Sequence, residues 1–383
     1  LALLNVLPTL LLSPFSGALV DRYPRGRILL LCDIASLLTI ISAASLAAAG
    51  HFSILMAGVI MLLLAIVQTV RWPALLSCIS TITPKEHMPR VTGFEEAIQA
   101  SSTVAAPILG AAIFHFSGLT PIFLFDALSY IASMLALGLV GLSWRSPAQA
   151  EGKNLAGVFS DPAFGFRWIF QHHHLLRLLV FLAIFNIGCA IFVTAQTPLV
   201  LSYFNAATLG TVMASGSTGL VLGGVLMTAI GGINPYQRGV LLGACGIGLG
   251  VLVFGLAQSL LLFAIGAFLF GFLHPVVNSS IQVIWRNETP IEIQGRVFAA
   301  RRMISWGLNP LAIAASIPLS TYLFGPLLDL LKTHAPKFAA VWGVGQAGSL
   351  GLMLSTLGLL MLALTGFYFI RRVLDYTPAP HSD

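Results

Sequence analysis

Residues 178–199 read LLVFLAIFNIGCAIFVTAQTPL, a run without one charged side chain. An α-helix of roughly 20 apolar residues crosses the hydrocarbon core of a bilayer, which is about 30 Å thick, so this run is long enough to span a membrane. The whole chain has the same character: 57% of its residues are hydrophobic, 8% are charged, and its mean hydropathy is +0.93. Such a chain cannot fold as one globule surrounded by water, so we expect lipid to contact most of its surface.

Ten further runs meet the same length criterion, so the sequence predicts eleven membrane-spanning helices. They lack the alternation of polar and apolar residues that a closed barrel of strands requires. The predicted fold class is therefore an all-α polytopic membrane protein. The ten runs are 1–20, 28–49, 52–70, 97–116, 121–142, 211–230, 240–257, 260–283, 303–323 and 350–370.

The basic residues predict the orientation of these helices. All but two of the 19 Lys and Arg residues fall in alternate gaps between the runs, and the exceptions are Lys332 and Lys337. Because loops rich in Lys and Arg stay in the cytoplasm, we expect the C-terminus inside the cell and the protein in the inner membrane. The net charge of +6 is then a feature of topology, and no nucleic-acid partner is expected.

The longest charged gap divides the chain into two parts. Five predicted helices precede it and six follow it, and the chain begins inside an apolar run at Leu1. We therefore expect two six-helix halves, with the first helix missing from this chain. The predicted domains are an N-terminal transmembrane half (1–142), a cytoplasmic central loop (143–177) and a C-terminal transmembrane half (178–383).

A short internal repeat supports this division. Thr83-Pro84 with Glu86 recurs 206 residues later as Thr289-Pro290 with Glu292. Each copy is predicted to be a capping box, with Thr as the N-cap and Pro in the first turn of a helix. Matching positions in the two halves favour parallel repeats about an axis along the membrane normal.

The segment Gly17-Ala-Leu-Val-Asp21-Arg22-Tyr-Pro-Arg25 lies where the first predicted helix leaves the membrane on the cytoplasmic side. It resembles the G-x-L-x-D-R-x-x-R-R motif of the major facilitator superfamily, although Gly26 replaces the last basic residue. The resemblance implies a cytoplasmic gate in which Asp21 faces the positive end of the helix that begins near Arg296. Gly17 would allow close helix contact, and Arg22 and Arg25 would bind carboxylates.

Further segments resemble the multidrug and siderophore exporter branch of that superfamily, the enterobactin-exporter-like group. They are Gln294–Met303 with Pro310, Trp72–Ala74, Phe125–Tyr130 and Gly219–Gly224. Pro107 and Gly110 look like a weakened antiporter motif that bends a helix, and plain helix packing explains them equally well.

Few charged or amide groups lie within the predicted helices. Asp33 and Asp126 are candidates for proton coupling, because a carboxylate inside a membrane is costly, although a structural hydrogen bond explains each of them as well. Five amides are candidates for a substrate cavity, with interhelical hydrogen bonding as the alternative. They are Gln99, Asn186, Gln196, Asn278 and Gln282.

No nucleotide-binding, catalytic-triad or zinc motif is evident, and the four cysteines are scattered singly. We therefore expect no enzyme activity, no metal and no bound cofactor. The resemblance implies a monomeric exporter of small amphipathic or hydrophobic compounds such as drugs, siderophores or secondary metabolites, driven by a proton gradient and surrounded by lipid. An importer or a lysolipid flippase on the same scaffold is the alternative, and a membrane-embedded enzyme is a remote one.

Overall fold

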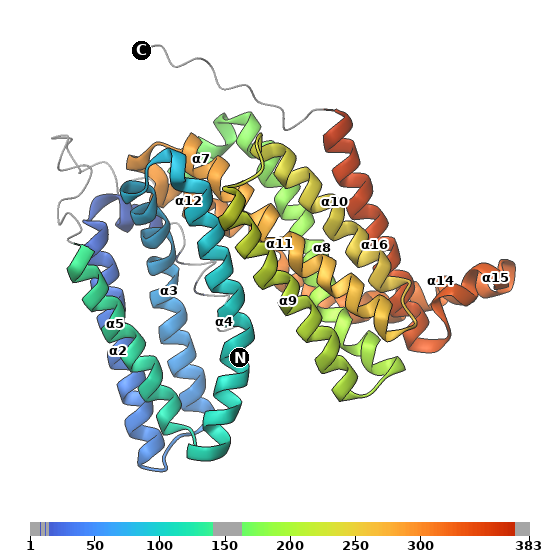
Figure 1. Ribbon diagram of the computed structural model, residues 1–383, viewed down its shortest axis with the longest axis horizontal. Coiled ribbons are helices and arrows are strands. Elements are labelled where there is room, and N and C mark those ends of the chain that lie inside the picture. The colour runs from blue at the N-terminus through green and yellow to red at the C-terminus, as the bar shows by residue number, and fades with distance from the viewer. Residues whose placement is uncertain (1–7, 9–11, 13–14, 141–162, 372–383) are drawn as a thin grey trace. The chain divides into compact units, whose positions relative to one another are not determined.

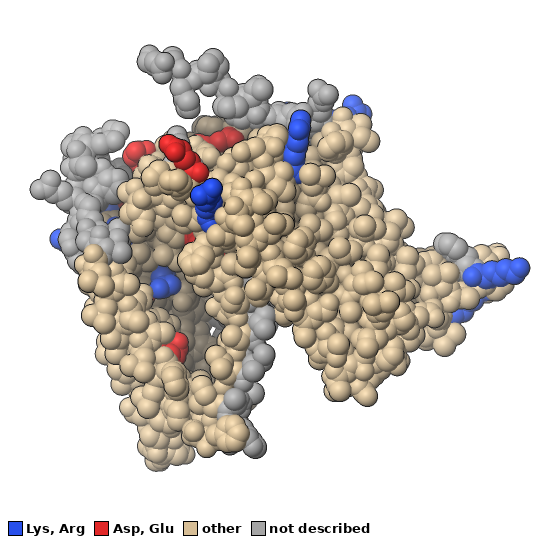
Figure 2. All heavy atoms as spheres, in the orientation of Figure 1, with Lys and Arg blue, Asp and Glu red and all other residues tan. Residues whose placement is uncertain are grey.

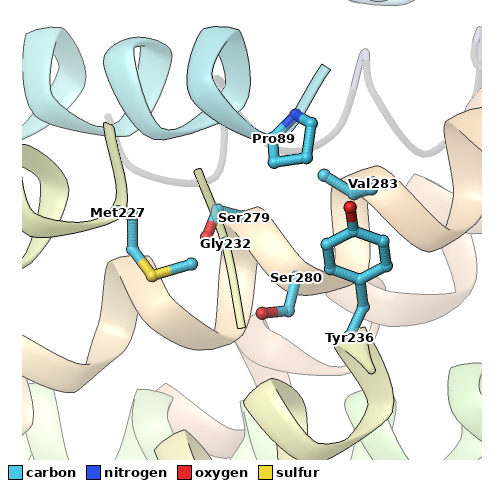
Figure 3. A pocket seen from close by; sticks show the side chains of 7 residues that line it. All are labelled: Pro89, Met227, Gly232, Tyr236, Ser279, Ser280 and Val283. Carbon is cyan, nitrogen blue, oxygen red and sulfur yellow. The ribbon is translucent and has the colours of Figure 1, made fainter. Parts of the chain in front are cut away.

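The computed structural model describes residues 8, 12, 15–140 and 163–371 (Figure 1). Almost all of these residues are helical, and the described ranges contain no strand. Nine of the helical stretches in them are long and apolar enough to cross a membrane. Lys, Arg, Asp and Glu side chains occupy little of the face seen in Figure 2. The predicted all-α polytopic fold is confirmed, while most of the run 1–20 lies outside the described residues.

The helices follow one another with short connections. Eight of the nine stretches are single helices: α2 (Arg25–Ala48), α3 (Ile54–Ile82), α5 (Thr120–Val140), α8 (His173–Tyr203), α9 (Ala206–Ile230), α10 (Tyr236–Gly255), α11 (Leu260–Glu288) and α16 (Gly345–Ile370). The ninth, Ile291–His334, joins η3 (Ile291–Ile293), α12 (Gln294–Trp306), α13 (Asn309–Pro318), the π-helical turn η4 (Leu319–Phe324) and α14 (Gly325–His334). The remaining elements are η1 (Lys85–His87), α4 (Met88–Ser117), α7 (Phe164–Gln171), α15 (Pro336–Ala339) and η5 (Ala340–Trp342).

The chain forms two compact units. Unit 1 comprises Leu1–Pro84, Ala105–His173 and Arg286–Gly307, and unit 2 comprises Lys85–Val104, His174–Trp285 and Leu308–Asp383. Two segments are not in the unit that the predicted halves would give them: Lys85–Val104 belongs to unit 2 and Arg286–Gly307 to unit 1. The first directly follows one copy of the Thr-Pro repeat, and the second contains the other copy. The units are defined by contacts, whereas the predicted halves are defined by the internal repeat and the charged gap. The two divisions do not test each other, so the boundary at 143–177 stays a prediction.

In unit 1, α2 packs against both α3 and α5. Its core contains Val20, Leu29, Ala74 and Cys78, which are almost completely buried. In unit 2, α9 packs against α11 where glycines remove the side chains between them. A Cβ on Gly223 would lie 2.1 Å from the carbonyl oxygen of Phe272. Small residues at such positions let two membrane helices approach until their backbones touch.

The two Thr-Pro repeats do not form capping boxes, so that prediction is wrong. Thr83 ends α3, and Pro290, whose side chain makes no capping hydrogen bond, precedes the 3₁₀ turn η3. Proline has no N–H and fixes its own φ, which suits a short turn between two long helices. Each repeat therefore leads into a 3₁₀ turn, η1 or η3, before the next α-helix begins.

Candidate functional site

The carboxylate of Asp21 lies at the first turn of α12, within unit 1. Its Oδ1 accepts a hydrogen bond from the backbone N–H of Gly295 at 2.8 Å. Its Oδ2 accepts from the backbone N–H of Arg296 at 3.2 Å and from Nε of the same residue at 2.9 Å. These N–H groups have no partner inside α12, and they form its positive end. We call this arrangement the clasp: Gly17, Asp21, Gly295 and Arg296.

Glycine at three positions makes the clasp sterically possible. A Cβ on Gly17 would lie 2.6 Å from Cα of Arg296, and one on Gly295 would lie 2.5 Å from Oδ1 of Asp21. A Cβ on Gly165, in α7, would lie 2.3 Å from the carbonyl oxygen of Arg296. The ring of Phe164, also in α7, lies 4.0 Å from the guanidinium of Arg296. The sequence analysis missed both α7 residues, because they fall in the predicted central loop.

Burial raises the pKa of Asp21 to about 6, although Arg296 and the two backbone N–H groups act to lower it. The carboxylate is still mainly ionised at pH 7, so the clasp is a contact between a charge and a helix end. The cost of burial cancels part of the energy of these hydrogen bonds. The charge itself therefore contributes modestly to the clasp, and close packing of backbone contributes the rest.

The two other basic residues of the motif have separate roles. Arg25 donates from Nη1 to the carbonyl oxygen of Ser77 at 3.3 Å and to the hydroxyl of Thr81, and from Nη2 to the carbonyl oxygen of Ile291 at 2.6 Å. The expectation that it binds a carboxylate directly is corrected: it joins the start of α2 to α3 and η3. The guanidinium of Arg22 lies 5.7 Å from the ring of Tyr23.

Asp33 forms a network that joins three helices of unit 1. Its Oδ1 accepts a hydrogen bond from Nε of Arg71 at 2.8 Å, and its Oδ2 accepts from the hydroxyl of Ser133 at 2.6 Å. These residues lie on α2, α3 and α5. The side chain of Asp33 is 0% exposed and that of Arg71 is 23% exposed. We call this arrangement the Asp33 network, and its ion pair sits inside membrane-spanning helices.

Arg71 was assigned to a cytoplasmic gap in the sequence analysis, and the structure corrects this. It lies within α3, which continues to Ile82. Hydropathy ends the predicted helix at Val70 because Arg71 is charged. Hydropathy does not reveal that Asp33, 38 residues earlier, pairs with Arg71.

Asp126 lies in the second turn of α5, where it is half-buried, and its carbonyl oxygen accepts a hydrogen bond from Ser129 at 2.7 Å. Pro107 and Gly110 both lie within α4, which is continuous to Ser117. A Cβ built on Gly110 would meet no atom within 4 Å. The close packing expected at this glycine is therefore not formed in this structure.

All five candidate cavity amides lie in unit 2. Gln99 is on α4, Asn186 and Gln196 are on α8, and Asn278 and Gln282 are on α11. Gln99 is exposed and the other four are half-buried. The structure thus confines the candidates to one unit and to three helices.

On α11, a stripe of residues spaced by four contains a titratable group that the sequence analysis missed. Nδ2 of Asn278 lies 3.1 Å from Nδ1 of His274, and the His274 ring lies 6.0 Å from that of Phe270. Phe270 in turn contacts Phe192 of α8 at 4.4 Å between ring centroids. If the amide donates, Nδ1 is the acceptor and the imidazole proton resides on Nε2. The sequence did contain a signal for this pair: His274 and Asn278 are four residues apart, which places them on the same face of a helix.

Residues 1–310 match the model of the Major Facilitator Superfamily. The chain belongs to this superfamily. Among curated members, Macrolide efflux protein A of Streptococcus pyogenes is 22% identical over 329 residues, covering 82% of this chain and 78% of the relative. The protein of the same name from Enterococcus faecalis is 22% identical over 313 residues, covering 78% of this chain and 93% of the relative.

Two solved superfamily structures are similar to this one. The human organic anion transporter MFSD10 has a TM-score of 0.64 at 18% identity, covering 94% of this chain and 82% of that chain. A bacterial homologue of the iron transporter ferroportin, in its outward-facing state, has a TM-score of 0.55 at 17% identity, covering 94% and 89%. At these identities the likeness shows the transporter fold, and this chain is a multi-pass membrane transporter by family.

Proposed function

We propose that this chain is a proton-coupled exporter of small amphipathic or hydrophobic compounds that works by alternating access. The efflux direction is supported by relatives that are named macrolide efflux proteins. The chain has no evident nucleotide-binding motif, so we propose an ion gradient as its energy source. By the distribution of Lys and Arg, we place it in the inner membrane with a cytoplasmic C-terminus. We propose that it works as a monomer.

The observation that carries the coupling proposal is the Asp33 network. Ionised Asp33 balances the charge of Arg71 and holds α2, α3 and α5 together through its two oxygens. A proton on Asp33 removes that balance and leaves a partly buried guanidinium without its counter-ion, which costs several kcal/mol. The helices then favour another arrangement, because the two protonation states differ in energy between conformations. Proton binding on one side of the membrane and release on the other would drive the cycle.

We assign the clasp the role of cytoplasmic gate. Asp21 and α12 are in contact here, and this contact must break for a path to open on the cytoplasmic side. A charge at a helix end contributes up to about 2 kcal/mol in a partly buried site, and 1.4 kcal/mol changes a two-state ratio tenfold. That range is suited to a contact that forms and breaks in every cycle.

The deciding experiment is transport in proteoliposomes with an imposed pH gradient. A macrolide and a lipophilic cationic dye are the substrates, and internal pH is recorded with a trapped indicator. We expect substrate movement to be accompanied by proton movement in the opposite direction, and both to be lost in Asp33→Asn. Movement of substrate and protons in the same direction would favour the importer. Movement of lysolipid, with no transport of either compound, would favour the flippase.

A further inference from the structure

The stretch Ile291–His334 is longer than a membrane requires. It contains 44 residues. At 1.5 Å per residue it measures about 66 Å along its helices, roughly twice the 30 Å of a hydrocarbon core. Its beginning is fixed by the clasp at Gly295 and Arg296. The last turns, which form α14, must therefore lie beyond the hydrocarbon core or turn along its surface.

The structure shows such a turn. η4 adopts a π-helical turn between Pro318 and Gly325, and Figure 1 shows α14 and α15 extending away from the axis of α16. α14 contacts α16 through Leu328, which is almost fully buried beside Gly348. Prolines and π-helical turns are the usual places where a helix changes direction. α14 thus runs outward while one edge stays attached to unit 2.

The far end of this excursion is tied down. After α15, the carbonyl oxygen of Trp342 accepts a hydrogen bond from the hydroxyl of Tyr203 at 3.0 Å. The indole Nε1 of Trp342 donates to the hydroxyl of Ser355 at 2.8 Å. The Nε2 of Gln258 donates to the carbonyl oxygen of Val341 at 2.6 Å. These bonds attach the segment to the C-terminal end of α8, to the connection between α10 and α11, and to the middle of α16. α14 and α15 are therefore a strap with two fixed ends.

α14 has an apolar side that is partly exposed in the described part of the chain. At 100° per residue, Leu327, Leu330 and Leu331 share one side of the helix with the edge that carries Leu328, while Asp329 and Thr333 lie opposite. Leu327 is 39% exposed and Leu330 is 58% exposed. Tyr322 and Leu323 of η4, which precede α14 in the chain, are exposed as well.

Basic residues lie at the margin of this surface. Nζ of Lys332 is 3.2 Å from Oδ1 of Asp329, and both are exposed enough to exchange partners with solvent or lipid. Lys337 follows on α15 and is exposed. Figure 2 shows Lys or Arg side chains on the α14 and α15 projection. Long basic side chains bordering a leucine face are typical of helices that lie in a membrane interface.

We propose that α14 lies in the bilayer interface on the predicted outer side, with Leu327 and Leu330 among the acyl chains and Lys332 and Lys337 at lipid phosphates. The bilayer is the occupant favoured here, because exposed leucines bordered by lysines lie on a helix of a multi-pass membrane protein, joined directly to an apolar stretch long enough to span the membrane. This attachment holds the joint between α13 and α14 at a fixed depth. It does not depend on which substrate the protein carries.

The test uses nitroxide spin labels on the purified protein in lipid nanodiscs of phosphatidylcholine and phosphatidylglycerol. Single cysteines are introduced by Leu330→Cys and, as the matched control, Asp329→Cys, after serine has replaced the four native cysteines. Oxygen concentrates in lipid and a nickel chelate stays in water. We expect the label at position 330 to have an oxygen-to-nickel accessibility ratio at least threefold above that at position 329.

Two outcomes would overturn the proposal. Equal ratios at both positions would place α14 in water. Protection of position 330 from both reagents would place it against protein, for example a second copy of the chain. The lysines are tested in the same sample with K332Q and K337Q together: we expect a shallower label at position 330 with phosphatidylglycerol present. An unchanged depth would overturn the headgroup contact.

Discussion

Nε of Arg71 donates to Oδ1 of Asp33 at 2.8 Å, so one full ion pair is held between two membrane-spanning helices. In the structure both partners lie within helices, and Asp33 is completely buried. Ionisable residues inside a membrane are costly and usually functional. The pair is thus the strongest candidate in unit 1 for linking a proton to a change of shape.

Replacing Asp33 by Asn should abolish coupling. The amide still accepts a hydrogen bond, but it cannot bind and release a proton, so we expect substrate-driven proton flux to fall to background while substrate binding persists. The measurement is internal pH in proteoliposomes together with equilibrium binding. Because an unpaired Arg71 lowers the free energy of unfolding by about 3 to 5 kcal/mol, the double variant D33N/R71Q restores charge balance and should restore expression without coupling. Asp329→Asn, at an exposed ion pair, is the control. Normal proton flux in the double variant would show that the pair is structural.

A side chain at Gly17 should force the clasp open. Gly17→Val would place atoms within 3 Å of the α12 backbone, which cannot move aside cheaply. We expect Ala299, which is almost fully buried beside Gly17, to become accessible to a thiol reagent when changed to cysteine, with transport reduced at least tenfold. Gly110→Val is the matched control, since that glycine has open space around it. Equal effects of the two valines would mean that general helix damage, rather than the clasp, limits transport.

Removing the charge of Asp21 should have a smaller effect than filling Gly17. Asp21→Asn keeps the shape but directs an amide toward the N–H groups of Gly295 and Arg296, so part of the contact is lost. Because burial already offsets part of the charge interaction, we expect at most about a tenfold shift toward the open clasp. Expression should be close to wild type. Labelling at position 299 in the same assay gives the ratio, and unchanged labelling with unchanged transport would remove the carboxylate from the gate.

We predict that His274 supports substrate binding in unit 2, because it contacts Asn278, one of the candidate cavity amides. His274→Gln keeps a polar group but removes the imidazole that meets Asn278, and a hydrogen bond between neutral groups contributes about 0.5 to 1.5 kcal/mol. We therefore expect substrate affinity to weaken by a factor of about 2 to 10, as measured by equilibrium binding. His334→Gln, on the exposed side of α14, is the control. Equal substrate affinities for wild type and His274→Gln would leave this residue a packing role only.

The sequence predicted the position of a functional residue where a short local motif contains it. Asp21 could be placed at a helix end because its motif and the start of the α12 segment are both visible in the chain. Arg71 could not be placed inside a helix from the sequence, since its position in α3 depends on an ion pair with Asp33 of α2. Gly165 and Phe164 were missed for a similar reason: eight helical residues in a polar gap show no membrane signal, and only the fold brings them beside Arg296.

The contact between α9 and α11 limits how unit 2 can deform. Where the Cα of Gly223 approaches the carbonyl of Phe272, and Gly271 approaches that of Gly216, no side chain separates the two backbones. A slide of one residue along either helix would drive a bulky neighbour, such as Phe268 or Phe272, into the opposite backbone. The contact therefore fixes the register of α9 against α11. We expect the two helices to move as one rigid body through the transport cycle, with no sliding between them.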